Sequence, residues 1–309
     1  MAELMPPATT PAAGGGGPAS VDIRVLGPLE VTGGDGLPLL LGAPKVRTLL
    51  AILVLAEGRP LTAATLVDRI WGPRAPAKAL GSLQVYVSHL RRLLEPGRLP
   101  RTPSRVLTFD SAGYRLTVAR ERVDVTRFLA LVAEAEHAAD PRAVERAAAG
   151  ALALWRGEPY ADLGGQEYVA AAVARLTEAR ERARELRVSA VLRQGRHREV
   201  VGELEALTHE HPLREPLWAL RALALYRCGR QGEALQVLRA VRRTLAEELG
   251  IDPGDELREL ERHILRQSPH LRPPGTRSSL PVPPSSRCRI RSRPPGPPAA
   301  PPPVRPYHG

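Results

Sequence analysis

The strongest constraint on the fold is a row of apolar residues that recurs at intervals of three and four between residues 77 and 95. This spacing places the side chains on one face of an α-helix. The apolar row consists of Leu80, Leu83, Val87, Leu90 and Leu94. The opposite face carries Lys78, Gly81, Ser82, Val85, Ser88, His89 and Arg92. We therefore predict a helix over about 77–95 that packs one face into a core and leaves the other face free.

Shorter elements surround this helix. Residues 44–57 have the apolar spacing of a helix, and Thr62 can cap a second helix that ends before Gly72 and Pro73. After the helix over 77–95, the segments 106–109 and 114–118 flank a turn, and together they predict a β-hairpin. Two helices, a third helix with a polar outer face, and a hairpin predict a winged helix-turn-helix, whose third helix enters the major groove of DNA.

A small antiparallel sheet is expected at the start of this module. Apolar and polar residues alternate over 21–25, and turns separate this segment from 29–31 and 37–41. With the hairpin, this sheet supplies the only β-structure that the sequence predicts.

The second half of the chain is predicted to be almost entirely helical. Gly195 and Arg196 recur 34 residues later as Gly229 and Arg230, and the same offset relates Leu204 to Leu238. A period of 34 residues is typical of tetratricopeptide repeats, in which stacked helix pairs bury a common core. The predicted fold class is therefore mainly α with a small β component: a winged helix-turn-helix followed by an all-α tetratricopeptide-like domain.

Charge and composition divide the chain into four predicted segments. Residues 1–19 and 269–309 are rich in Pro, Gly or Arg and are expected to be disordered, the latter holding 14 of the 32 prolines. Residues 20–119, the predicted DNA-binding domain, carry a net charge of +6, whereas residues 120–268, the predicted helical domain, carry −1. A basic module beside a near-neutral one indicates a DNA-binding domain joined to a protein-binding domain. We expect a fragment that ends near Arg120 to bind DNA without activating transcription.

The candidate DNA contacts are basic, hydrogen-bonding or small side chains on the third helix and around the wing. We predict that Val85 and His89 read base edges and that Arg91 contacts phosphate. The full predicted set is Lys78, Ser82, Val85, His89, Arg91, Arg92, Arg105 and Arg115. The aromatic residues Tyr86, Trp71, Trp155 and Trp218 are expected to pack rather than to bind.

Several segments resemble one known family in combination and in order. Residues 42–50, 66–72, 83–92 and 113–116 resemble the OmpR-type winged helix of AfsR/SARP transcriptional activators. Residues 151–159, 210–215 and 247–254 resemble the bacterial transcriptional activation domain that follows it in that family. The resemblance covers about residues 20–268. Gly81 stands where family members often have Asn, and Asp110 places a carboxylate near the wing tip.

The resemblance implies a cytoplasmic activator of a secondary-metabolite gene cluster. Such a protein binds direct repeats in duplex DNA, in some cases as a homodimer, and recruits RNA polymerase. Two alternatives stay open from the residues alone: a repressor with the same fold, and a tetratricopeptide adaptor whose winged module docks protein instead of DNA. A role for the Pro/Arg-rich tail in DNA or partner binding is as consistent with the sequence as no role.

Enzymatic, cofactor-dependent and membrane functions are not predicted. The chain has no phosphate-binding P-loop, because Lys45 and Lys78 lack the Gly before and the Ser or Thr after that such a loop needs. His209 and His211 have no third metal ligand at a useful spacing. No apolar stretch approaches the length of about 20 residues that spans a bilayer. We therefore expect no cofactor, no metal and no membrane partner, and we expect Cys228 and Cys288 to be free thiols.

Overall fold

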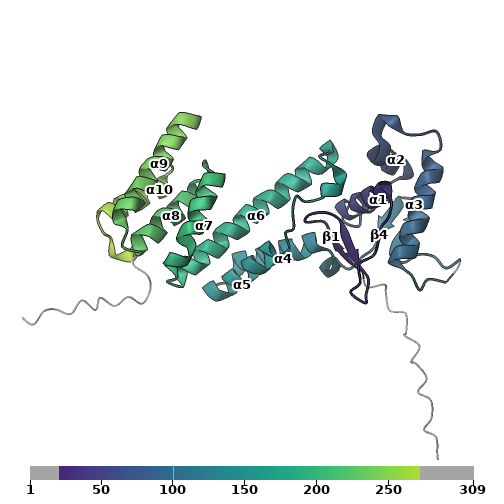
Figure 1. Cartoon of the computed structure of the whole chain (residues 1–309), viewed down its shortest axis with the longest axis horizontal. Helices are drawn as coiled ribbons and strands as arrows, with labels where there is room; N and C mark the ends of the chain where they lie inside the picture. The colour runs from purple at the N-terminus through teal and green to yellow at the C-terminus, as the bar shows by residue number, and fades with distance from the viewer. Residues whose placement is uncertain (1–20, 100, 272–309) are drawn as a thin grey trace, which may run out of the picture. The chain divides into compact units, whose positions relative to one another are not determined.

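A computed structural model of the chain describes residues 21–99 and 101–271. The predicted disordered segments lie outside these residues, apart from 269–271. The first half of the structure contains the expected mixture of short strands and helices (Figure 1). Its elements are β1 (Asp22–Arg24), β2 (Glu30–Thr32), α1 (Pro44–Leu55), α2 (Ala63–Trp71), η1 (Gly72–Arg74), α3 (Ala79–Leu94), β3 (Leu107–Asp110) and β4 (Gly113–Leu116).

The remaining described residues are helical. The elements are η2 (Arg120–Arg122), α4 (Asp124–His137), α5 (Pro141–Leu152), η3 (Ala161–Leu163), α6 (Glu167–Arg193), α7 (His197–Glu210), α8 (Glu215–Arg227), α9 (Gln231–Leu249), α10 (Asp255–Leu265) and η4 (Pro269–Leu271). Helices α5 and α6 pack together, as do α7 and α8, and α8 and α9. The predicted fold class, a winged helix followed by an all-α domain, is confirmed.

The β-structure is smaller than the sequence predicts. Strands β1 and β2 pair antiparallel, with Ile23 opposite Val31, and β3 pairs with β4 to form the predicted hairpin. The expected third strand at 37–41 is wrong, because only Pro38 forms a bridge to Thr32. Leu41 is buried and Leu39 is half-buried, but Leu37 and Leu40 are exposed, so only the end of this segment packs against the core.

The winged module and the first helices after it share one hydrophobic core. The core contains Leu49, Leu83 and Leu90 from the helices of the module. It also contains Phe128 of α4 and Leu163 of η3, which are 0% and 3% exposed. The boundary predicted between residues 119 and 120 therefore runs through a continuous set of buried contacts.

A buried carboxylate joins the two sides of this boundary. Asp124, 1% exposed, accepts hydrogen bonds at 2.9 Å from the backbone N–H groups of Val25 and Leu26 and at 2.8 Å from that of Val125. Burial raises the pKa of the Asp124 carboxyl, and the N–H donors act in the opposite direction. Arg156 adds a positive charge 3.8 Å away. The carboxylate thus fixes the end of β1 against the start of α4.

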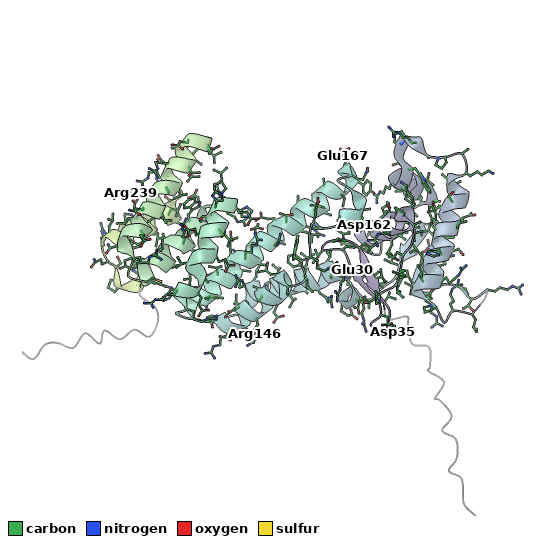
Figure 2. The ribbon with its side chains drawn as sticks, in the orientation of Figure 1. Glu30, Asp35, Arg146, Asp162, Glu167 and Arg239 are labelled. Atoms are coloured by element: carbon green, nitrogen blue, oxygen red, sulfur yellow. The ribbon has the colours of Figure 1, made fainter. Side chains whose placement is uncertain are left out.

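A second set of polar contacts follows the same junction. Arg47 of α1 pairs with Asp162 of η3 at 2.6 Å, and Asp162 also accepts a hydrogen bond from the backbone of Leu29. Arg156 pairs with Glu30 at 2.7 Å; Figure 2 marks Glu30 and Asp162. Gly27 lies so near Arg156 that a Cβ atom at this glycine would come within 3.0 Å of the arginine Cβ. The fit therefore depends on backbone proximity as well as on charge.

The 34-residue repeat predicted from the sequence has a structural counterpart. Gly195 and Gly229 end α6 and α8 with positive φ angles of 82° and 79°. Arg196 pairs with Glu199 at 2.6 Å, and the equivalent residues, Arg230 and Glu233, pair at 2.5 Å. Equivalent turns and ion pairs therefore begin α7 and α9, as expected for repeated helix pairs.

Leucines at equivalent positions of the repeat should make similar contributions to the free energy of unfolding. Leu204 and Leu238 are 0% and 4% exposed, so we expect Leu204→Ala and Leu238→Ala each to lower the free energy of unfolding by about 2–5 kcal/mol. Urea denaturation followed by circular dichroism measures this change. Leu213→Ala is the control, because Leu213 is 43% exposed and should cost little. Equal losses from all three variants would contradict the stacked-repeat core.

Candidate DNA interface

The third helix of the winged module, α3, has one buried and one exposed face. Ala79, Leu83, Val87, Leu90 and Leu94 are buried, and the helix packs against α1 and α2. The prediction that Leu80 is buried is wrong, since its side chain is 58% exposed. Ala79 takes the inner position of the first turn instead, four residues before Leu83, and this turns Leu80 outward.

The neighbouring helix positions α3 by a cap and an aromatic stack. Thr62 accepts a hydrogen bond from the backbone of Thr65 at 3.1 Å, which confirms the predicted cap of α2. Trp71 at the end of α2 stacks on Tyr86 of α3 with 6.0 Å between ring centroids. Tyr86 therefore packs, as predicted.

The exposed face of α3 contains some of the predicted contact residues. Val85 is 65% exposed, and Lys78 and Arg92 are exposed as well. Ser82 and His89 are half-buried, and His89 Nε2 would lie 3.9 Å from a Cβ atom placed on Gly42. Val85, Lys78 and Arg92 are therefore more accessible to a DNA groove than Ser82 and His89.

Four exposed residues on this helix, Leu80, Gly81, Gln84 and Ser88, were not among the predicted contacts. Gln84 lies between the buried positions 83 and 87 and is exposed, and Leu80 is exposed for the reason given above. Gln84 could have been found from the sequence, because it falls outside the apolar row and carries an amide that can pair with adenine. No signal in the sequence distinguishes Leu80 from the buried leucines.

Arg91 takes part in the packing of the wing. Its Nε donates a hydrogen bond to the carbonyl of Leu107 at 2.9 Å. Nearby, Glu95 accepts hydrogen bonds from the Ser104 hydroxyl and from the backbone N–H of Arg105. These contacts join the end of α3 to the first strand of the hairpin. The phosphate contact predicted for Arg91 stays a prediction, and it now has to be separated from this structural role.

The wing is the β3–β4 hairpin, and its tip makes several local contacts. Phe109 is 61% exposed and its ring centroid lies 4.6 Å from that of Tyr114. Arg115 lies 3.6 Å from Asp110, so the carboxylate at the wing tip offsets part of the charge of this predicted contact residue. Gly113 has φ 126°, and a Cβ atom there would come within 2.2 Å of the Leu61 carbonyl oxygen.

Charge pairing differs between the two halves of the described chain. None of the ion pairs within residues 21–99 and 101–271 involves Lys78, Arg92 or Arg105. In residues 120–271 about half of the arginines face a carboxylate, as Arg214 faces Glu178 at 2.8 Å, whereas in residues 21–99 and 101–119 only Arg24, Arg47 and Arg115 do. The positive charge on and beside α3 is therefore available to an anionic partner.

Other kinds of site find little support in the described residues. Between 21 and 271, with residue 100 left aside, no group of three His, Cys, Asp or Glu side chains is arranged to hold a metal ion. No helix in these residues is both long and apolar enough to cross a membrane.

Comparison with known proteins defines the class to which this arrangement belongs. Residues 39–116 match the family described as transcriptional regulatory protein, C terminal, and residues 123–265 match the bacterial transcriptional activator domain. The matched segments are the winged module and the helices from α4 to α10. The fold is thus that of a DNA-binding transcriptional regulator.

Named relatives share both segments. The chain is 36% identical to the regulatory protein DnrI of Streptomyces peucetius over 81% of this chain and 94% of DnrI. It is 43% identical to the regulatory protein AfsR of Streptomyces coelicolor over 80% of this chain and 24% of AfsR. The chain belongs to the AfsR/SARP family of transcriptional activators, as its sequence motifs predict.

A solved structure supports the same fold. The chain superimposes on Mycobacterium tuberculosis EmbR, which was solved in complex with a low-affinity phosphopeptide, with a TM-score of 0.73 and 40% sequence identity. The match covers 81% of this chain and 66% of that one. Against the EmbR sequences the chain spans 64% of the relatives' length.

Proposed function

We propose that the chain binds direct repeats in promoter DNA through α3 and the wing, and that its helical domain recruits RNA polymerase to a secondary-metabolite gene cluster. The observation that carries the DNA-binding part is the unpaired positive charge around the exposed face of α3. A major groove about 12 Å wide admits one helix and exposes the base edges to it. Lys78 and Arg92 are exposed near the two ends of α3, which supports a role for them in contacting phosphate.

Within this proposal Val85 reads sequence and Arg92 supplies affinity. An exposed aliphatic side chain can contact the methyl group of thymine, whereas a guanidinium contacts phosphate whatever the base. Ser82 and His89 are half-buried, so we propose that they make smaller contacts with the bases than Val85 does. Arg105, just before β3, and Arg115, in β4, are proposed to contact the DNA backbone beside the groove.

Salt titration of DNA binding tests this assignment. We expect the affinity for a fragment from upstream of the chain's own gene to fall with salt, with a log–log slope of about −0.9 per phosphate contact. Arg92→Ala should reduce the magnitude of that slope by about one unit and weaken all sequences alike. Arg239→Ala is the matched control, because Arg239 is an exposed arginine of α9 (Figure 2).

Competition between mutated sites tests the reading of sequence. Val85→Ala should change the preference at one base step by about 1–3 kcal/mol and leave the salt slope unchanged. Fluorescence anisotropy with labelled duplexes measures both quantities. An affinity that does not change with salt, or equal affinity for a shuffled fragment, would favour the protein-docking adaptor over a specific regulator.

The helical domain is proposed to meet protein, either polymerase or a second protomer on the adjacent repeat. Its near-neutral net charge offers little attraction for DNA. In vitro transcription with purified polymerase separates the alternatives. Increased transcript from the target promoter supports an activator, whereas decreased transcript would identify a repressor with the same fold.

A further inference from the structure

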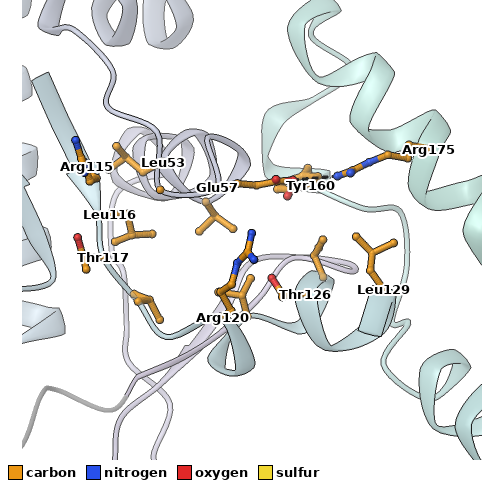
Figure 3. Close-up of a pocket in the computed structure, with 15 residues that line it drawn as sticks. Leu53, Glu57, Arg115, Leu116, Thr117, Arg120, Thr126, Leu129, Tyr160 and Arg175 are labelled. Carbon is orange, nitrogen blue, oxygen red and sulfur yellow. Dashed lines mark hydrogen bonds and ion pairs between the residues drawn. The ribbon is translucent and has the colours of Figure 1, made fainter. Parts of the chain in front are cut away.

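A cavity lies where the winged module meets the helical domain (Figure 3). Its volume is about 540 Å³, which is within the range of about 300–1,000 Å³ found for small-molecule sites. The walls come from the end of α1, from β4 and the residues after it, and from α4. The apolar lining consists of Leu53, Val54, Leu116, Val118, Val123, Val125 and Leu129.

Positive charge surrounds this apolar lining. Arg115, Arg120 and Arg175 line the cavity together with a single carboxylate, Glu57. Arg175 pairs with Glu57 at 2.9 Å, and Arg115 lies 3.6 Å from Asp110, so carboxylates offset the charge of two of the three arginines. Figure 3 shows the Arg120 side chain directed toward the middle of the lining residues, and no ion pair of Arg120 occurs within residues 21–99 and 101–271. The cavity therefore has positive charge in excess.

Two further polar groups stand in the cavity wall. The Arg115 Nε is buried and has no hydrogen-bond acceptor among the described residues. The Tyr160 side chain also lines the cavity and is 4% exposed. Burial and then the carboxylate of Glu57 raise the pKa of Tyr160, so its hydroxyl keeps its proton and can donate. Both groups are donors, which suits an acceptor-rich ligand.

We propose that this cavity binds a small amphipathic anion, a molecule with an apolar body and one carboxylate or sulfonate group. The apolar body would occupy the space between Leu116 and Leu129, and the anionic group would face Arg120. The Arg-rich C-terminal segment does not fit, because its charge of +7 over residues 269–309 would meet a positive rim. A bound ligand would touch both the winged module and the helical domain.

The test uses the full chain and the fluorescent probe 1-anilinonaphthalene-8-sulfonate, which has an aromatic body and one sulfonate. We expect saturable binding at one site. Arg120→Ser should weaken it by roughly tenfold, because a charge-assisted contact is lost. Thr126→Trp should abolish it by filling the cavity. Arg146→Ser is the matched control and should leave binding unchanged, since Arg146 is an exposed arginine of α5 (Figure 2).

An uncharged analogue shows whether the anion matters. N-phenyl-1-naphthylamine has the same aromatic body without the sulfonate, so it should bind more weakly and respond equally to Arg120→Ser and Arg146→Ser. Circular dichroism confirms that each variant is folded, and Arg120→Ser decides the outcome if Thr126→Trp does not fold. Absence of saturable binding, or equal affinity of the Arg120 and Arg146 variants for the anionic probe, would overturn the proposal. The readout needs no DNA, so it is independent of the proposed promoter binding.

Discussion

A chain that ends at residue 120 is expected to lose both its folded structure and its promoter binding. Such a fragment lacks Val125, Phe128 and Leu163, which are 4%, 0% and 3% exposed in the shared core. Losing a large buried side chain costs about 2–5 kcal/mol, and a domain has only about 5–15 kcal/mol of stability in total. This expectation replaces the one drawn from the sequence, that the fragment keeps a working DNA-binding domain.

A longer fragment supplies the control. A chain that ends at residue 194 keeps α4, α5, η3 and α6, and with them every residue of the shared core. We expect this fragment to unfold cooperatively on heating and to bind promoter DNA, while the fragment ending at residue 120 does neither. Circular dichroism melts and fluorescence anisotropy compare the two. Promoter binding by the shorter fragment with the affinity of the full chain would show that the module folds alone.

Asp124→Ala should be among the most damaging single substitutions in the chain. It leaves the N–H groups of Val25 and Leu26 buried without an acceptor, and it removes the carboxylate that faces Arg156. Removing one partner of such a buried set costs about 3–5 kcal/mol. Urea denaturation measures this loss as a lower midpoint of unfolding, with the slope of the free energy against urea concentration unchanged.

Asp140→Ala is the matched control for that substitution. Asp140 also accepts backbone hydrogen bonds, from Arg142 at 3.3 Å and Ala143 at 3.2 Å, but it is exposed at the start of α5. The loss of a helix cap costs about 1 kcal/mol. A similar cost for the two variants would mean that the Asp124 carboxylate does not join the module to α4.

The parts of the fold that were predicted correctly depend on local signals. Thr62 caps α2 through a hydrogen bond with a residue three positions later, and Gly195 follows the end of α6 because glycine tolerates a positive φ. The periodic spacing of Leu83 to Leu94 predicts a helix with one apolar face, and the structure buries that face. Each signal lies within about one turn of the residues it describes.

The parts that could not be predicted depend on contacts between distant residues. Nothing near Leu80 in sequence shows that the first turn of α3 points it outward. Asp124 is placed by Val25, 99 residues away, and Arg91 by Leu107. Charge and exposure identify candidate DNA contacts such as Arg92, but which arginines are engaged within the protein follows only from the tertiary structure.

The shared core also limits how new promoter specificities can arise by recombination. Exchange of the winged module alone between two family members would bring a foreign surface against Phe128 and Leu163, and would separate Arg47 from Asp162. An exchange that carries residues 21–193 together keeps these contacts within one parental sequence. We therefore expect chimeric activators joined after α6, at Gln194 and Gly195, to be functional more often than chimeras joined at residue 120.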